Sequence, residues 1–323
     1  MYQVKRLSRS EYLPIRNLTY HVLVWGEPAP DKVPLVMVHG WMDVAASYQF
    51  IVDAFAHDHY VVAPDWRGYG LTGIDGPPLD ADGPLGGQRS VGAKYWPDAD
   101  NYWYPDYLAD LDFLLDHYSP EAPVHLVGHS MGGNVVMLYA GTRPHRVRRL
   151  VNLEGFGMPA TRPAQAPKRY ARWMDELKAL HRGEMALKRY ESAAGVASRL
   201  MKTNKRLTQD KADWLARQWA KPDADGMWRI LGNPAHKITN AQLYRVDEVL
   251  EMFRSISAPT LVVEASDNNL ARWWQGKYTL DEFHERLKSV PDCRRAVVQD
   301  AGHMLHHDQP DRLAQLLQDF VDS

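Results

Sequence analysis

Short apolar runs alternate with helical patterns along most of the chain. The apolar runs are nearly continuous and are bounded by Gly, Pro or charged residues, at 18–25, 34–39, 59–64, 123–128, 148–154, 259–264 and 294–299. Apolar residues with a helical period lie between several of these runs, at 46–56, 104–118, 131–142, 279–289 and 309–322. Continuous apolar strands suit a sheet that is covered on both faces. We therefore predict an α/β fold, with a mostly parallel central sheet flanked by helices.

Two stretches interrupt this alternation. Residues 72–103 are rich in Gly, Pro and Asp and then in aromatic residues, and we predict a long excursion loop within the core, because loops of this length are usually functional or mobile. Residues 157–250 show helical patterns without a convincing strand. We predict that they form a helical cap inserted into a core domain that consists of residues 1–156 plus 251–323.

The composition of the chain limits the kinds of binding partner that we expect. The chain has 323 residues, of which 45% are apolar, and its 38 Lys and Arg against 40 Asp and Glu give a formal charge of −2. This balance gives no reason to expect binding to nucleic acid or to an anionic membrane. No run approaches the ~18 apolar residues of a membrane span, and residues 1–10 do not resemble a signal peptide. With Cys293 as the single cysteine, a cytoplasmic protein is expected.

A serine lies where a predicted strand turns into a predicted helix. Residues 128–132 read Gly-His-Ser-Met-Gly, after the apolar run 123–128 and before the helical pattern 131–142. This is the strand–turn–helix setting of a G-x-S-x-G nucleophile. The turn is too tight for side chains two positions before and after the serine, so glycine is needed there. We predict Ser130 as the nucleophile, and because a hydroxyl alone is a weak nucleophile, it requires a base.

A histidine follows the last predicted strand. Residues 294–303 form a strand, a short turn and then His303, which places this histidine at the carboxyl edge of the sheet, where α/β active sites lie. We predict His303 as the base, because His306 and His307 lie further into the next helix. The pattern His-x-x-His-His-Asp that starts at residue 303 also offers metal ligands, but no second cluster is spaced to join it. We therefore expect no metal site.

An acid is needed to orient the predicted base. A carboxylate that meets the far ring nitrogen fixes the tautomer and stabilises the imidazolium that forms during attack. Asp267 follows the strand 259–264 in a polar turn, and the order Ser, acid, His is the one expected on this architecture. We predict Asp267 in this role, although such turns also favour Asp for capping. Glu154, at the end of the run 148–154, is the alternative acid.

The segment after the run 34–39 is the candidate oxyanion hole. It reads His-Gly-Trp-Met-Asp from His39 to Asp43, and a glycine in second place lets the backbone approach a substrate. We predict that the backbone N–H groups of Trp41 and Met131 stabilise the developing oxyanion, a contribution that is typically worth several kcal/mol. His39 is expected to brace the loop by hydrogen bonding.

Together these motifs resemble the α/β-hydrolase superfamily. The resemblance covers the core from about residue 18 to 156 and from 256 to 320, and the His-Gly-Trp-Met-Asp segment looks most like the serine hydrolase-like proteins. The motifs stand in the family's order: HGW at 39–41, DWRGYG at 65–70, GHSMGG at 128–133, ASD at 265–267 and AGH at 301–303.

The resemblance implies a serine esterase that works through an acyl-Ser130 intermediate. Thioesters, lactones and amides are variants of the expected carboxylic-ester substrate, and neither a metal nor an organic cofactor is implied. Other readings stay open: a triad-bearing ligand receptor with negligible turnover, a carbon–carbon bond hydrolase, a cofactor-free haloperoxidase or a hydroxynitrile lyase.

Aromatic residues near the expected site suggest a small-molecule substrate with an apolar or aromatic part. In this fold a cap covers the catalytic mouth, so its side chains and the neighbouring loops shape the pocket. The candidate pocket residues are His129, Trp96, Trp103, Trp173 and Trp273.

Overall fold

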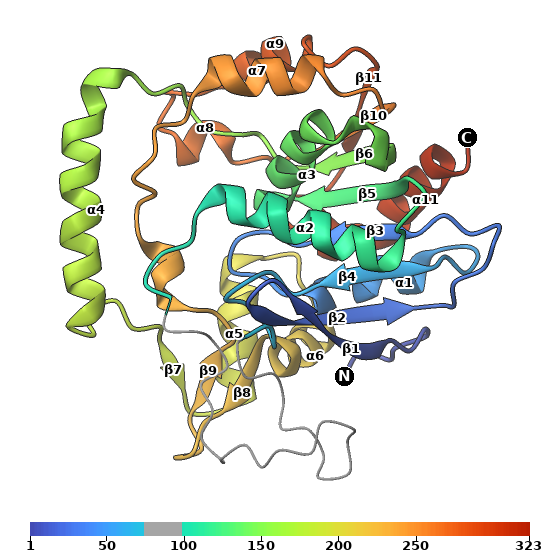
Figure 1. Cartoon of the computed structure of the whole chain (residues 1–323). Coiled ribbons are helices and arrows are strands. Elements are labelled where there is room, and N and C mark those ends of the chain that lie inside the picture. The colour runs from blue at the N-terminus through green and yellow to red at the C-terminus, as the bar shows by residue number, and fades with distance from the viewer. Residues whose placement is uncertain (74–98) are drawn as a thin grey trace.

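The central element of the structure, a computed structural model, is a sheet of eight strands (Figure 1). The structure describes residues 1–73 and 99–323, so most of the predicted excursion at 72–103 lies outside the described residues. The strands lie in the order β1-β2-β4-β3-β5-β6-β10-β11. Their bounds are β1 Arg9–Ile15, β2 Leu18–Trp25, β3 Leu35–Val38, β4 Val61–Pro64, β5 Val124–His129, β6 Val147–Leu153, β10 Thr260–Ala265 and β11 Cys293–Val298.

The sheet is mostly parallel, as the sequence predicts. The pairs from β4 through β11 are parallel, whereas β1 pairs antiparallel with β2 and β2 pairs antiparallel with β4. Every predicted strand forms within a few residues of its expected bounds. The apolar pattern did not reveal β1, because this edge strand is only partly buried and mixes polar with apolar positions.

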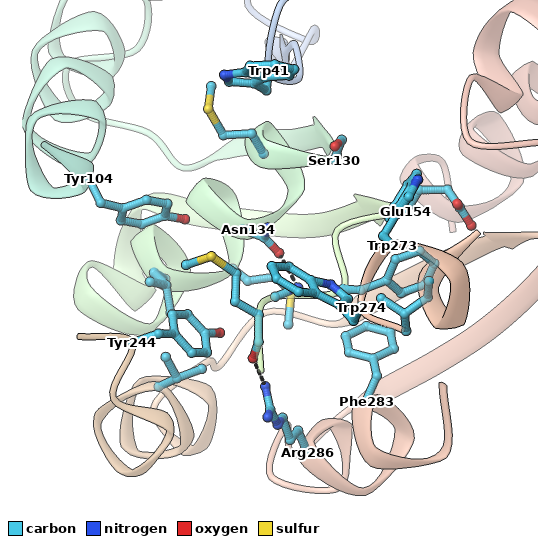
Figure 2. A pocket seen from close by; sticks show the side chains of 18 of the residues that line it. Trp41, Tyr104, Ser130, Asn134, Glu154, Tyr244, Trp273, Trp274, Phe283 and Arg286 are labelled. Atoms are coloured by element: carbon cyan, nitrogen blue, oxygen red, sulfur yellow. Dashed lines mark hydrogen bonds between the residues drawn. The ribbon is translucent and has the colours of Figure 1, made fainter. Parts of the chain in front are cut away.

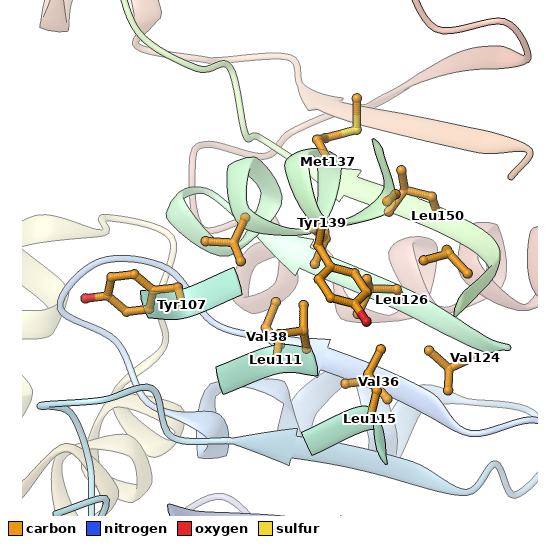
Figure 3. Packing of buried hydrophobic residues seen from close by; sticks show 14 of the residues in the cluster. Val36, Val38, Tyr107, Leu111, Leu115, Val124, Leu126, Met137, Tyr139 and Leu150 are labelled. Carbon is orange, nitrogen blue, oxygen red and sulfur yellow. The ribbon is translucent and has the colours of Figure 1, made fainter. Parts of the chain in front are cut away.

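Helices cover both faces of the sheet. The α-helices of the described residues are α1 Gln49–Ala54, α2 Tyr104–Tyr118, α3 Met131–Thr142, α4 Ala166–His181, α5 Ala193–Thr203, α6 Gln209–Trp219, α7 Val246–Arg254, α8 Leu270–Trp273, α9 Leu280–Leu287, α10 Leu305–Asp308 and α11 Pro310–Val321. On one face, Val36 and Leu126 of the sheet pack with Leu111 of α2 and Tyr139 of α3 (Figure 3). Helices α1 and α11 contribute to a second buried cluster, which also includes residues of β3, β4, β10 and β11.

The segment between β6 and α7 differs from the predicted helical cap. It contains α4, α5 and α6, but also a three-stranded antiparallel sheet in the order β7-β9-β8. These strands are Arg189–Tyr190, Trp228–Ile230 and Ala220–Pro222, which are too short to produce a readable period. The predicted boundary at residue 250 falls inside α7, and Val249 and Phe253 of this helix belong to the main core.

Helix α4 stands apart at the side of the molecule (Figure 1). Each of its sixteen residues is at least partly exposed. Among the helices of the described ranges 1–73 and 99–323, no membrane-spanning candidate is found, because none is long and apolar enough.

Candidate active site

Ser130 forms a strained turn between β5 and α3. Its backbone has φ 53° and ψ −113°, a region that a residue with a side chain rarely adopts. A Cβ on Gly128 would collide with the backbone of Gly132, and a Cβ on Gly132 would collide with the carbonyl oxygen of Val38. The two flanking glycines therefore allow β5, the Ser130 turn and α3 to pack with close backbone contact, as the predicted motif requires. The Ser130 N–H donates to the carbonyl of Leu153 at 2.8 Å and ties the turn to β6.

The predicted nucleophile and base are hydrogen bonded. The Ser130 hydroxyl lies 2.9 Å from Nε2 of His303 and can donate to it. The His303 ring is partly buried, with 21% of its side chain exposed, and it packs with the Trp273 ring in a T-shaped arrangement with centroids 4.5 Å apart. The imidazole is thus positioned to receive a proton from the serine.

The carboxylate beside the predicted base belongs to Glu154, the alternative acid of the sequence prediction. Nδ1 of His303 lies 3.2 Å from Oε2 of Glu154, and Oε1 accepts a hydrogen bond of 2.6 Å from the backbone N–H of Ala265. The carboxylate is fully buried, so it has little freedom to turn away. Glu154 directly follows β6, the strand next to β5, which explains its reach.

The prediction that Asp267 orients the base is wrong. Its side chain is 60% exposed and forms an ion pair with Arg206 from the α5–α6 connection. Only its backbone serves the site, because its N–H donates to the carbonyl of Ala301, just before the histidine, at 3.0 Å. Asp267 lies two residues beyond the end of β10, in a turn that directs the side chain to solvent.

The predicted oxyanion residues border the serine. A Cβ on Gly40 would lie 3.0 Å from Cβ of Ser130, so the loop after β3 packs directly against the nucleophile. Met131 is the first residue of α3, where backbone N–H groups have no acceptor within the helix. Trp41 and Met131 both line the cavity beside Ser130, and their pairing as oxyanion donors remains a prediction.

His39 braces this loop, as the sequence predicts. Its Nε2 accepts a hydrogen bond of 2.9 Å from the N–H of Trp66, and its own carbonyl accepts one of 2.9 Å from the Trp66 indole. Burial lowers the pKa of His39, which keeps the ring neutral and able to accept.

A cavity of about 550 Å³ opens beside Ser130 (Figure 2). Helices α3, α7 and α9 supply much of its wall, and most of the lining is apolar or aromatic. Representative residues are Met137, Phe156, Val249, Phe253, Trp273 and Phe283. The cavity therefore suits a substrate with an apolar part.

Of the four candidate pocket residues that the structure describes, one lines the cavity. Trp273 lines the cavity, whereas His129 is buried beneath His303 and donates from Nε2 to its carbonyl oxygen at 2.7 Å. Trp103 and Trp173 contact each other, with ring centroids 6.1 Å apart. His129, Trp103 and Trp173 are not among the described residues that line the cavity. Trp96 lies outside the described residues.

Two polar residues of the cavity were missed by sequence reasoning. Asn134 lies one helical turn after Ser130, on the same face of α3, and this spacing was a usable signal. Its side-chain oxygen accepts a hydrogen bond of 2.8 Å from the N–H of Gly157. Arg286 of α9 gave no such signal. Its guanidinium donates to the carbonyl of Met158 at 2.7 Å and to Glu282 at 2.5 Å, so its charge is compensated where it meets the cavity.

Two known proteins and one solved structure are similar to this chain. The chain is 23% identical to a serine hydrolase-like protein of Danio rerio, over 92% of this chain and 83% of the relative. It is 25% identical to a pyrrolizixenacetamide deacetylase of Xenorhabdus hominickii, over 89% and 90% of the two chains. Its fold is similar to that of the thioesterase domain from the curacin biosynthetic pathway, with a TM-score of 0.74, 21% identity, and 96% and 99% of the two chains covered.

A family model gives the wider assignment. The model of the alpha/beta hydrolase fold matches residues 33–310, a range that contains Ser130, Glu154 and His303. This range also spans β3 through β11 and the whole segment between β6 and α7. The chain therefore belongs to the α/β-hydrolase fold family.

Proposed function

We propose that the protein hydrolyses a carboxylic ester through an acyl-Ser130 intermediate. The observation that carries this proposal is the continuous chain of contacts from the Ser130 hydroxyl through His303 to the buried carboxylate of Glu154. This is the arrangement that turns a hydroxyl into a nucleophile.

The first half of the reaction transfers the acyl group to the serine. Nε2 of His303 takes the hydroxyl proton while Oγ of Ser130 attacks the carbonyl carbon, and the carbonyl oxygen becomes negative. The N–H groups of Trp41 and Met131 stabilise that charge. When the tetrahedral intermediate collapses, the bond to the leaving oxygen breaks and His303 donates its proton to that oxygen. The alcohol departs and the acyl-serine remains.

The second half returns the enzyme to its starting state. His303 takes a proton from a water molecule, whose oxygen attacks the acyl carbon. The second intermediate collapses with Oγ of Ser130 as the leaving group, and His303 returns the proton to it. In both halves the buried carboxylate of Glu154 faces the imidazolium that forms transiently and stabilises it.

The apolar cavity supports a substrate whose bound part is an alkyl or aromatic group. Its volume of about 550 Å³ is in the range of pockets for small molecules. The named activities of relatives, a thioesterase and an amide deacetylase, are acyl transfers to water. They support thioesters and amides as variants of the proposed ester substrate.

Covalent labelling tests the nucleophile. We expect a fluorophosphonate to label the wild-type protein at Ser130 and not to label Ser130→Ala. Ser257→Ala is the matched control, because Ser257 is exposed and lies outside the site, and it is expected to label fully. Unchanged labelling of Ser130→Ala would disprove the proposal.

Turnover separates an enzyme from a receptor. A chain-length series of p-nitrophenyl esters, run beside matched thioesters, lactones and amides, is expected to give multiple turnovers with esters preferred. Labelling at Ser130 with only a stoichiometric burst of product would instead indicate a ligand receptor. Cleavage of a carbon–carbon bond, with the esters left intact, would indicate a different serine-dependent reaction.

A further inference from the structure

A second cluster of chemically active side chains lies directly behind the candidate active site. Asp43 comes from the loop after β3, His129 from the end of β5 and His306 from α10. All three are buried, and each offers one ligand atom, with these atoms lying within 4.8 Å of one another. The reaction proposed above uses none of these side chains directly.

Within the described part of the chain, the converging atoms lack hydrogen-bond partners, although Oδ2 of Asp43 and Nε2 of His306 lie within ion-pair range of each other. Across residues 1–73 and 99–323, the structure provides no hydrogen-bond partner for Oδ2 of Asp43, Nδ1 of His129 or Nε2 of His306. Oδ2 of Asp43 and Nε2 of His306 are 3.7 Å apart, which is too long for a hydrogen bond. Ligand atoms placed tetrahedrally at about 2.0–2.2 Å from a Zn²⁺ ion are separated by roughly 3.3–3.6 Å. The spacing therefore suits a shared ion better than a direct bond.

The opposite sides of two of these groups are anchored. Nε2 of His129 must carry the hydrogen, because it faces the carbonyl of His303 at 2.7 Å, so its Nδ1 presents a lone pair to the cluster. Oδ1 of Asp43 accepts from the N–H of Val44 at 2.9 Å and from the hydroxyl of Ser47. Histidines that bind metals commonly donate their other N–H to a backbone carbonyl in this way.

We propose that Asp43, His129 and His306 bind one divalent transition-metal ion, with Zn²⁺ the best fit to two imidazole nitrogens and a carboxylate oxygen. The sequence pattern at residues 303–308 suggested no such site, because two of the ligands lie far away in the sequence. The ion's role is positional. It fixes His129, which holds the main chain of His303 in place.

Zinc binding can be measured without reference to turnover. Protein without a polyhistidine tag is stripped with a chelator and titrated with Zn²⁺ against a chromophoric competitor. A surface cluster of His57, His59 and Asp322 also offers ligands, so the measurement uses the His57→Gln/His59→Gln protein. We expect one Zn²⁺ per chain, a raised Tm with Zn²⁺, and the intense visible bands of four-coordinate Co²⁺ when cobalt replaces zinc.

Replacing the proposed metal ligands shows where the Zn²⁺ ion binds. Adding His306→Gln to the surface-cleared protein is expected to weaken Zn²⁺ binding at least 100-fold. His307→Gln is the matched control, because His307 is the buried neighbour outside the cluster, and it is expected to retain binding. If His306→Gln does not fold, Asp43→Asn replaces it. If neither variant folds, the Co²⁺ spectrum of the surface-cleared protein decides, and absence of four-coordinate bands overturns the proposal.

A further arm separates this site from the Ser130–His303 pair. Fluorophosphonate-labelled protein is expected to bind Zn²⁺ as tightly as unlabelled protein, because the label occupies the cavity and not the buried cluster. Loss of zinc binding on labelling overturns the proposal, as does the absence of a one-to-one complex in the surface-cleared protein. Because this binding is independent of turnover, its failure leaves the proposed ester hydrolysis untouched.

Discussion

At the residue scale, Glu154 combines backbone strain with strong anchoring. Its φ of 56° lies in the left-handed region, which costs a residue with a side chain of order 1 kcal/mol or more. Its N–H donates to the carbonyl of Val263 at 3.0 Å, and its carboxylate receives the N–H of Ala265. These bonds to β10 hold the residue in the conformation that turns its other oxygen toward His303.

Replacing Glu154 tests this reading of the acid. Glu154→Gln keeps the shape of the side chain but removes its charge, so the imidazolium loses its partner and the histidine tautomer is no longer fixed. We expect kcat/KM for a p-nitrophenyl ester to fall by about 10³–10⁴-fold. Asp267→Asn is the matched control and is expected to change kcat/KM by less than about threefold, because an exposed ion pair contributes little. A large loss in Asp267→Asn, together with little change in Glu154→Gln, would restore Asp267 as the acid.

The sequence predicted the positions of Ser130 and His303 but chose the wrong carboxylate. The difference lies in the local backbone around each residue. Ser130 and His303 were predictable because short motifs fix their positions relative to a strand end. Glu154 and Asp267 both follow strands at the same edge of the sheet, and the direction of a side chain after a strand depends on one or two backbone angles. Asn134 was within reach of the helical period, whereas the fold alone brings Arg286 to the cavity.

At the element scale, the unit of β5, Ser130 and α3 depends on close backbone contact. Gly132 faces the carbonyl oxygens of Val38 and His39, so α3 and the end of β3 pack with no room for a side chain. The core elements were predictable because each strand and helix is long enough to show its period. The strands β7, β8 and β9 were not, because two or three residues carry no period and their pairing is decided by tertiary contacts.

Enlarging this glycine is expected to disrupt the unit. In Gly132→Ala, the new methyl group would overlap backbone atoms that cannot move without separating α3 from β3. We expect a loss of about 1–3 kcal/mol in the free energy of unfolding, measured by urea denaturation. Gly195→Ala in α5 is the control: a Cβ there would lie 3.5 Å from Tyr190, so a neutral to slightly stabilising effect is expected. A Gly132→Ala protein as stable as wild type would contradict the packing argument.

At the scale of the whole molecule, buried histidines link stability to pH. His125 on β5 is 7% exposed, and burial, together with Arg148 and Arg149, lowers its pKa to about 4. An unfolded histidine titrates near pH 6.5. Below that pH the unfolded chain takes up a proton that the folded chain does not, so stability is retained above pH 6.5 and lost as the pH falls toward about 4.

His125→Gln measures this contribution. Wild-type protein is expected to lose about 1–2 kcal/mol more than the variant between about pH 6.5 and pH 5, from urea unfolding at each pH. The reason is that the variant has no proton to take up at this position. Identical slopes of stability against pH in the two proteins would show that the folded pKa of His125 is not lowered.

The isolation of α4 has a consequence for how the molecule opens. A sixteen-residue helix with no fully buried residue is only marginally stable by its own hydrogen bonds. Its ties include a bond of 2.6 Å from Arg169 to the carbonyl of Asn240. Its amide hydrogens therefore exchange with solvent through local fraying while those of β5 and β6 stay protected, so a protease can nick this helix before the sheet yields.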